Sequence, residues 1–222
     1  MIRPTRIYQI SESAVTIEFA ADATPEANSS AIEFTRKVDE LAPAGVVETV
    51  PAHSSATIFF DTRALGTTPV GRVEQLVDQV LPSIRTAGRS SSDPIEIAVK
   101  FDRGGTYDLE SSASDAGLSV DEFVSIFLAG SYVVRMLGFL PGFVYLGEVD
   151  ARIAMPRLST PRRVVPRGAV GIADRQTGIY SMESPGGWRV IGITEFTLFD
   201  PESFPPPRLE PGAIIRFVEI KE

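Results

Sequence analysis

The amino-acid sequence predicts an α+β fold in which a small N-terminal domain of strands and helices precedes a β-barrel domain. Residues 1–88 mix short strand-like runs with two segments of helical period, whereas the chain beyond residue 132 carries only short strand-like runs divided by Gly and Pro. The small polar stretch Thr86–Pro94 lies between these patterns and is typical of a linker. We therefore expect domains over residues 1–88 and 94–222. A chain of 222 residues with 43% hydrophobic content is long enough to bury two modest cores.

The N-terminal domain is expected to follow the order β-β-α-β-β-α, which is typical of helices packed on one face of an antiparallel sheet. Thr24 is suited to cap a helix whose first residue is Pro25, because the missing N–H of proline costs nothing at that position. The expected strands are Arg6–Ile10, Ala14–Ala20, Gly45–Val50 and Ala56–Asp61. The apolar face of the first helix comprises Ala27, Ala31, Phe34, Val38 and Leu41, and that of the second helix, over Pro69–Leu81, comprises Val70, Val73, Leu76, Val77, Val80 and Leu81.

The C-terminal domain begins with an alternating strand, Ile95–Phe101, which two short helices follow. The second helix has a marked start, because Ser119 precedes Glu122 by three residues and so predicts a capping box. Beyond this helix, many short strands with tight turns are typical of a closed or nearly closed β-barrel. The expected strand-like runs are Tyr132–Phe139, Gly168–Ala173, Trp188–Thr194, Glu195–Phe199 and Ala213–Ile220.

The composition excludes several classes of function. A formal net charge of −8 opposes non-specific binding to nucleic acid. The chain has no cysteine and one histidine, His53, which excludes thiol nucleophiles, disulfides and a zinc centre built from Cys and His, so that no metal site is expected. No P-loop motif and no run of about 18 apolar residues is present, and we expect a cytoplasmic protein without a membrane span.

The charge of one segment departs from that of the whole chain. Between Ala151 and Arg175 the sequence has six arginines and a single carboxylate, Asp174. Arginine binds carboxylates and phosphates through two parallel hydrogen bonds, so the segment fits an anion site or a surface for an acidic partner. The alternative is a solvated loop whose arginines cover apolar surface. The arginines are Arg152, Arg157, Arg162, Arg163, Arg167 and Arg175.

Two further stretches combine aromatic residues with glycine. Gly138–Gly147 (GFLPGFVYLG) places Phe139, Phe143 and Tyr145 around a Pro-Gly turn, which fits either core aromatics at a barrel corner or the wall of an apolar pocket or interface. Gly171–Trp188 (GIADRQTGIYSMESPGGW) combines polar side chains with glycines that would permit a positive φ or the close approach of a ligand.

Several motifs, in order along nearly the whole chain, resemble the family of KipI and the 5-oxoprolinase B subunits, which is also called allophanate hydrolase subunit 1. They include Arg6–Phe19 (RIYQISESAVTIEF), Gly138–Gly147, Thr160–Arg163 (TPRR), Val165–Ala173 (VPRGAVGIA), Gln176–Trp188 (QTGIYSMESPGGW) and Pro211–Ile220 (PGAIIRFVEI).

The resemblance implies a small α+β domain followed by a cyclophilin-like β-barrel. It also implies the non-autonomous B subunit of a 5-oxoprolinase, which opens 5-oxo-L-proline to L-glutamate at the expense of ATP together with a sister C subunit of related barrel fold and an A subunit. Two alternatives stay open, because one fold hosts several functions: a KipI-type inhibitor of a sensor histidine kinase, or the first subunit of an allophanate hydrolase or urea carboxylase-like pair.

Six residues are expected to line the ligand or partner surface that the resemblance implies. Glu183 is the candidate catalytic acid–base group, Arg162 would pair with an anion, Gln176 would hydrogen-bond an amide or carboxylate, and Trp188 would form an apolar wall; Thr177 and Tyr180 complete the set. The chain departs from the family pattern at Phe127, where a histidine is usual, and at Ile193, where a basic residue is usual.

Overall fold

The computed structural model describes residues 3–65, 67–83 and 93–220. The chain forms two compact units, Met1–Ser91 and Ser92–Glu222, and each has its own hydrophobic core. The expected linker Thr86–Pro94 lies outside the described residues except for Asp93 and Pro94, so its character stays a prediction.

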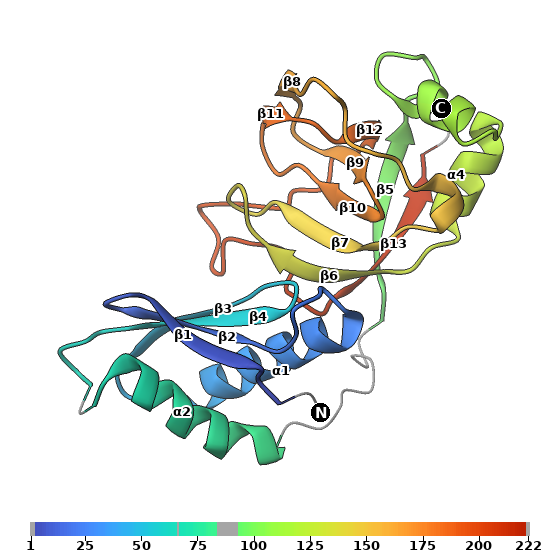
Figure 1. Cartoon of the computed structure of the whole chain (residues 1–222). Coiled ribbons are helices and arrows are strands. Elements are labelled where there is room, and N and C mark those ends of the chain that lie inside the picture. The colour runs from blue at the N-terminus through green and yellow to red at the C-terminus, as the bar shows by residue number, and fades with distance from the viewer. Residues whose placement is uncertain (1–2, 66, 84–92, 221–222) are drawn as a thin grey trace. The chain divides into compact units, whose positions relative to one another are not determined.

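The first unit is a four-stranded antiparallel sheet in the order β1-β2-β4-β3. Two helices lie on the same face of this sheet (Figure 1) and bury the inward-facing side chains of β2 and β4. Val15, Ile17 and Ile58 are fully buried there against Phe34 and Leu76. The elements are β1 (Arg6–Ser11), β2 (Ala14–Glu18), α1 (Pro25–Leu41), β3 (Val46–Pro51), β4 (Ser55–Phe60), α2 (Pro69–Val80) and a 3-10 turn, η1 (Leu81–Ser83).

The predicted start of α1 is confirmed, because the side chain of Thr24 accepts a hydrogen bond from the Ala27 N–H at 3.2 Å. Thr68 caps α2 in the same way, with the Gly71 N–H at 3.1 Å. The expected apolar face of α1 is wrong in one position: Leu41 is 47% exposed. It is the last residue of the helix, where the chain leaves in a left-handed conformation at Ala42.

The second unit is a closed seven-stranded barrel in the order β10-β7-β6-β13-β5-β12-β9, which confirms the predicted α+β class with a barrel (Figure 1). All described neighbours in it are antiparallel except β13, which runs parallel to β5. The barrel strands are β5 (Ile95–Phe101), β6 (Tyr132–Leu137), β7 (Val144–Glu148), β9 (Ala169–Ala173), β10 (Gln176–Ile179), β12 (Arg189–Ile193) and β13 (Ile214–Glu219). A separate two-stranded sheet joins β8 (Arg162–Val165) to β11 (Ser184–Gly186), and η2 covers Ala151–Ile153.

Two helices, α3 (Leu109–Asp115) and α4 (Val120–Leu128), complete the second unit. The predicted capping box at α4 is confirmed: Ser119 accepts from the Glu122 N–H while the Glu122 carboxylate accepts from the Ser119 N–H. Phe127 is fully buried and stacks on Phe217 with ring centroids 5.0 Å apart. A phenylalanine at this position therefore serves the core of the barrel domain.

One expected strand is wrong. Glu195–Phe199 forms no strand, and only Phe199 makes an isolated bridge, to Pro207. The partner segment contains Pro205, Pro206 and Pro207, which lack the N–H groups that a ladder requires.

Candidate functional site

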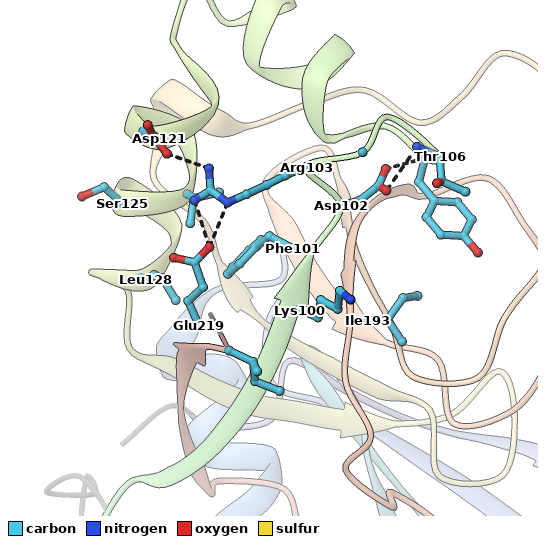
Figure 2. A pocket seen from close by; sticks show the side chains of 14 residues that line it. Lys100, Phe101, Asp102, Arg103, Thr106, Asp121, Ser125, Leu128, Ile193 and Glu219 are labelled. Atoms are coloured by element: carbon cyan, nitrogen blue, oxygen red, sulfur yellow. Dashed lines mark hydrogen bonds and ion pairs between the residues drawn. The ribbon is translucent and has the colours of Figure 1, made fainter. Parts of the chain in front are cut away.

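The described part of the second unit has a hollow of about 950 Å³ beside the C-terminal end of β5 (Figure 2). Its apolar wall comes from Phe101 at the end of β5, from Ile193 at the end of β12, and from Val124 and Leu128 on α4. Ile193 and Lys100 are cross-strand neighbours on this wall. Ile193, one of the departures from the family pattern, thus lines a cavity.

The polar rim of the hollow is held together by Arg103. Its guanidinium donates to Asp121 at 2.6 Å and to Glu219 at 3.0 Å, so that it joins the start of α4 to the end of β13 (Figure 2). These hydrogen bonds raise the pKa of Arg103. Two carboxylates neutralise this cation, and Arg103 therefore fixes the rim and does not offer an open anion site.

Tyr107 connects the hollow to a second polar centre. Its backbone N–H donates to the Asp102 carboxylate, and the guanidinium carbon of Arg162 lies 5.9 Å from the centre of its ring. Arg162 donates two hydrogen bonds of 2.7 Å to the two oxygens of Asp108. The same carboxylate accepts from the Val190 N–H at 2.7 Å.

Asp108 therefore ties three elements together: β8 through Arg162, β12 through Val190, and the start of α3, which begins at the next residue. The Asp108 side chain is only 8% exposed and that of Arg162 is 26% exposed. The hydrogen bonds to Asp108 raise the pKa of Arg162. Arg162 thus already has an anionic partner, and an external anion would reach only its remaining exposed edge.

Tyr180 and Trp188 belong to a buried aromatic cluster. The ring of Phe143 lies edge-on to both, with centroid separations of 5.0 Å and 5.7 Å. Burial raises the pKa of Tyr180, although a hydrogen bond from the Trp188 backbone opposes this. Arg157 adds a cation over the Trp188 ring, 5.9 Å from its centroid. Both predicted residues lie in the core, and Trp188 is 5% exposed.

The expectation about the glycines of Gly171–Trp188 is wrong as far as positive φ is concerned, because none of these glycines adopts it. Three of them, Gly171, Gly178 and Gly186, make room for the aromatic cluster. A Cβ at Gly171 or Gly178 would lie 3.1 Å or 3.0 Å from atoms of Trp188, and one at Gly186 would overlap the Tyr180 hydroxyl. The residue with positive φ in this stretch is Asp174, at φ 53, in the turn between β9 and β10.

The other predicted residues lie apart. Thr177 is fully buried and donates to the Gly171 carbonyl at 2.9 Å, which is a contact within the barrel wall. Gln176 is half-buried at the start of β10, paired with Glu148 of β7. Glu183 is exposed in the loop after β10, and no hydrogen bond or ion pair to another described residue involves it. The structure therefore does not bring the six residues into one cavity.

The arginines of the segment Ala151–Arg175 likewise do not form one common site, because three of them pair with different carboxylates. Arg152 pairs with Asp150 and Arg175 with Glu148, both at 2.8 Å, while Arg162 pairs with Asp108. These partners lie before the segment in the sequence, which is why the local count overstated its charge. Arg157, Arg163 and Arg167 are exposed and form no ion pair with a described carboxylate.

Within Gly138–Gly147, the core interpretation is confirmed for Phe143, and the pocket or interface interpretation stays a prediction for Phe139. Phe143 is 1% exposed in the aromatic cluster, whereas Phe139 is 63% exposed at the turn. The predicted Pro-Gly turn is present, with Gly142 at φ 73.

Sequence reasoning missed the groups that organise the candidate site, namely Asp102, Arg103, Asp108 and Glu219. Asp102 and Arg103 directly follow the predicted strand Ile95–Phe101, and polar residues at a strand end were a usable signal. Asp108 carried no local signal. No group of described residues is suited to hold a metal ion, and none of the described helices is long and apolar enough to cross a membrane.

Comparisons with known proteins agree on one family. The family model described as "Carboxyltransferase domain, subdomain C and D" matches residues 5–209 of this chain. The 5-oxoprolinase B subunit of Bacillus subtilis is 37% identical over 226 residues, covering 98% of this chain and 93% of the relative. That of Escherichia coli O157:H7 is 34% identical over 218 residues, covering 98% and 97%.

Among solved structures, TTHA0988 is similar with a TM-score of 0.81 and 32% identity. The match covers 94% of this chain and 40% of TTHA0988, so this chain spans less than half the length of that protein.

Proposed function

The chain belongs to the family of 5-oxoprolinase B subunits, and on that premise we propose that it is the B subunit of an ATP-dependent 5-oxoprolinase. The observation that carries this proposal is the similarity to proteins of that name over nearly the full length of both chains. The substrate is 5-oxo-L-proline and the product is L-glutamate. The protein is inactive alone and acts with partner subunits.

The chemistry of the reaction favours a complex that uses ATP. Opening an unstrained lactam with water is uphill near neutral pH, and phosphorylation of the amide oxygen makes the carbonyl carbon a better electrophile. The complex uses the ATP, and because this chain has no P-loop motif, the nucleotide is bound either by a partner subunit or by a different architecture. Because ATP is available in the cytoplasm, we place the complex there. Its other members are a sister C subunit and an A subunit.

The test measures glutamate release from 5-oxo-L-proline, with and without ATP, by this chain alone and by the chain co-purified with its partner subunits. We expect glutamate only from the assembled complex with ATP. A stable complex that binds all its subunits and releases no glutamate would contradict the proposal, and its activity on allophanate would then identify the amide-hydrolase alternative.

We expect Glu183→Ala to lower the turnover of the assembled complex at least about 100-fold if Glu183 transfers a proton. The fold should not change, because Glu183 is exposed and contacts no described partner through an ion pair. Gln176→Ala should lower turnover about tenfold through the loss of one hydrogen bond to substrate. Glu210→Ala, at another exposed carboxylate, is the control. Unchanged turnover in both variants would remove these residues from the site.

A further inference from the structure

The registers of the barrel strands bring several chain segments to one end of the barrel. The last residue of β6, Leu137, pairs with the first residue of β7, Val144, which also pairs with the last residue of β10, Ile179. Ile193, the last residue of β12, pairs with Ala169, the first residue of β9. The β6–β7 turn, the start of β9 and the segments after β10 and β12 therefore emerge together.

Hydrogen bonds and packing connect these segments. Ser181 donates to the Pro141 carbonyl at 2.6 Å, and the Thr194 N–H donates to the Gly168 carbonyl at 2.9 Å. Phe199 lies against Gly142 in the β6–β7 turn and begins a loop that closes at Pro207. Figure 1 shows this turn and the loop after β12 projecting on the same side of the barrel.

This end of the barrel exposes two large aromatic side chains. Of the thirteen phenylalanines, all within the described residues, only Phe139 and Phe204 are exposed, by 63% and 98%. Phe139 belongs to the β6–β7 turn and Phe204 to the loop between Phe199 and Pro207. Exposed aromatic rings of this size are costly in water, and they are enriched in the buried centres of protein interfaces.

The backbone of Phe139 gives a second, independent indication. Its φ of 69 lies in the left-handed region, which a bulky residue rarely adopts and where Gly or Asn is favoured. The fold thus holds a largely exposed phenylalanine in a strained conformation, and its ring makes an edge contact with Phe143 at a centroid separation of 5.6 Å. Strain of this kind is concentrated at functional sites.

Arg167 adds a cation at the same end of the barrel, because it directly precedes β9. It lies directly before Gly168 and donates to the Thr197 hydroxyl at 2.9 Å, but it forms no ion pair with a described carboxylate. Exposed aromatic residues together with arginine are the residue types that dominate the energetics of protein–protein interfaces. We call Phe139, Arg167 and Phe204 the barrel-end patch.

We propose that the barrel-end patch is the docking surface for the protein partner of this chain in the enzyme; this inference rests on the proposed function. The partner is expected to present an apolar socket for the two rings and a carboxylate for Arg167. The similar protein TTHA0988 supports a protein occupant, because there the matched part is only 40% of a longer polypeptide. The net charge of −8 opposes a nucleic acid as the occupant.

The test compares the affinity of the full chain and its variants for the purified partner subunits by titration calorimetry. Phe204→Ala and Phe139→Asn should each weaken binding about tenfold or more, and Arg167→Glu should weaken it about tenfold. Asn tolerates the left-handed backbone, so Phe139→Asn keeps the turn. Val47→Ser and Arg63→Glu, at side chains exposed elsewhere on the chain, are the controls, and their affinity should equal that of the wild type.

The outcomes separate this inference from the proposed function. Equal affinity of the patch variants and the wild type, in a complex that releases glutamate, overturns the docking surface and leaves the function standing. Weakened binding in a complex that releases none supports the docking surface and overturns the function. A wild-type chain that dimerises alone through the patch, and becomes monomeric on Phe204→Ala, shows that a second copy is the occupant and overturns the inference.

Discussion

Asp108→Ala is expected to destabilise the barrel unit by about 3 kcal/mol, the order found when one partner of a buried ion pair is removed. The substitution leaves the Arg162 guanidinium, 26% exposed, without its two hydrogen bonds and leaves the buried Val190 N–H without an acceptor. Because α3, β8 and β12 all lose the same anchor, the loss should be cooperative across the unit. Urea unfolding monitored by the fluorescence of Trp188, the single tryptophan, measures it.

Asp121→Ala is the matched control. Asp121 also pairs with an arginine at short distance, but its side chain is 86% exposed, and such pairs contribute about 0–1 kcal/mol. A loss of similar size in the two variants would show that burial does not distinguish these pairs. Asp108→Asn should fall between them, since the amide oxygen still accepts one hydrogen bond while its NH₂ group faces Arg162.

Gly168→Ala is expected to destabilise the same unit by about 3 kcal/mol, from a left-handed backbone and an overpacked site together. Gly168 has φ 80, and a Cβ there would overlap the Thr194 carbonyl oxygen. The Gly168 N–H donates to the Tyr180 carbonyl at 2.7 Å, and the Gly168 carbonyl accepts from the Thr194 N–H at 2.9 Å. The backbone therefore cannot move away without breaking one of these two hydrogen bonds between segments. Urea unfolding is the measurement, and we expect a lower midpoint concentration of urea for Gly168→Ala than for the wild type.

Gly117→Ala separates the two contributions. Gly117 has φ 70, and a Cβ there would meet nothing within 4 Å. This variant should therefore be destabilised only by the cost of the left-handed backbone conformation, about 1 kcal/mol. If Gly117→Ala and Gly168→Ala lose equal stability, the overlap with Thr194 contributes nothing and the structural account of Gly168 is wrong.

Local sequence patterns predicted most elements because the physical causes of those elements are local. The Thr24 and Ser119 caps, the apolar faces of α1 and α2, and the alternation of β5 each depend on residues within a few positions. The closure of the barrel depends on pairings that no local pattern encodes, such as that of Ile97 with Phe217. The barrel class was predicted from the density of strands and turns, while its order required the structure.

The candidate site was less predictable for the same reason. Arg162 was singled out from its sequence neighbours, but its chemistry is set by Asp108, which lies 54 positions earlier in the chain. The glycines before Trp188 suggested the approach of a ligand, whereas Gly171 and Gly178 accommodate the Trp188 side chain and Gly186 accommodates the Tyr180 ring. A residue type indicates which interactions are available, and the tertiary fold decides which one is made.

The pairing of β5 has a consequence for biosynthesis. Both neighbours of this strand, β12 and β13, are translated long after it, whereas every strand of the first unit pairs within that unit. The first unit can therefore fold while the ribosome is still elongating the chain, but β5 lacks both neighbours until β12 is translated and keeps one edge unpaired until β13 emerges. Synthesis of Ile214–Glu219 is thus the event that allows the barrel to close.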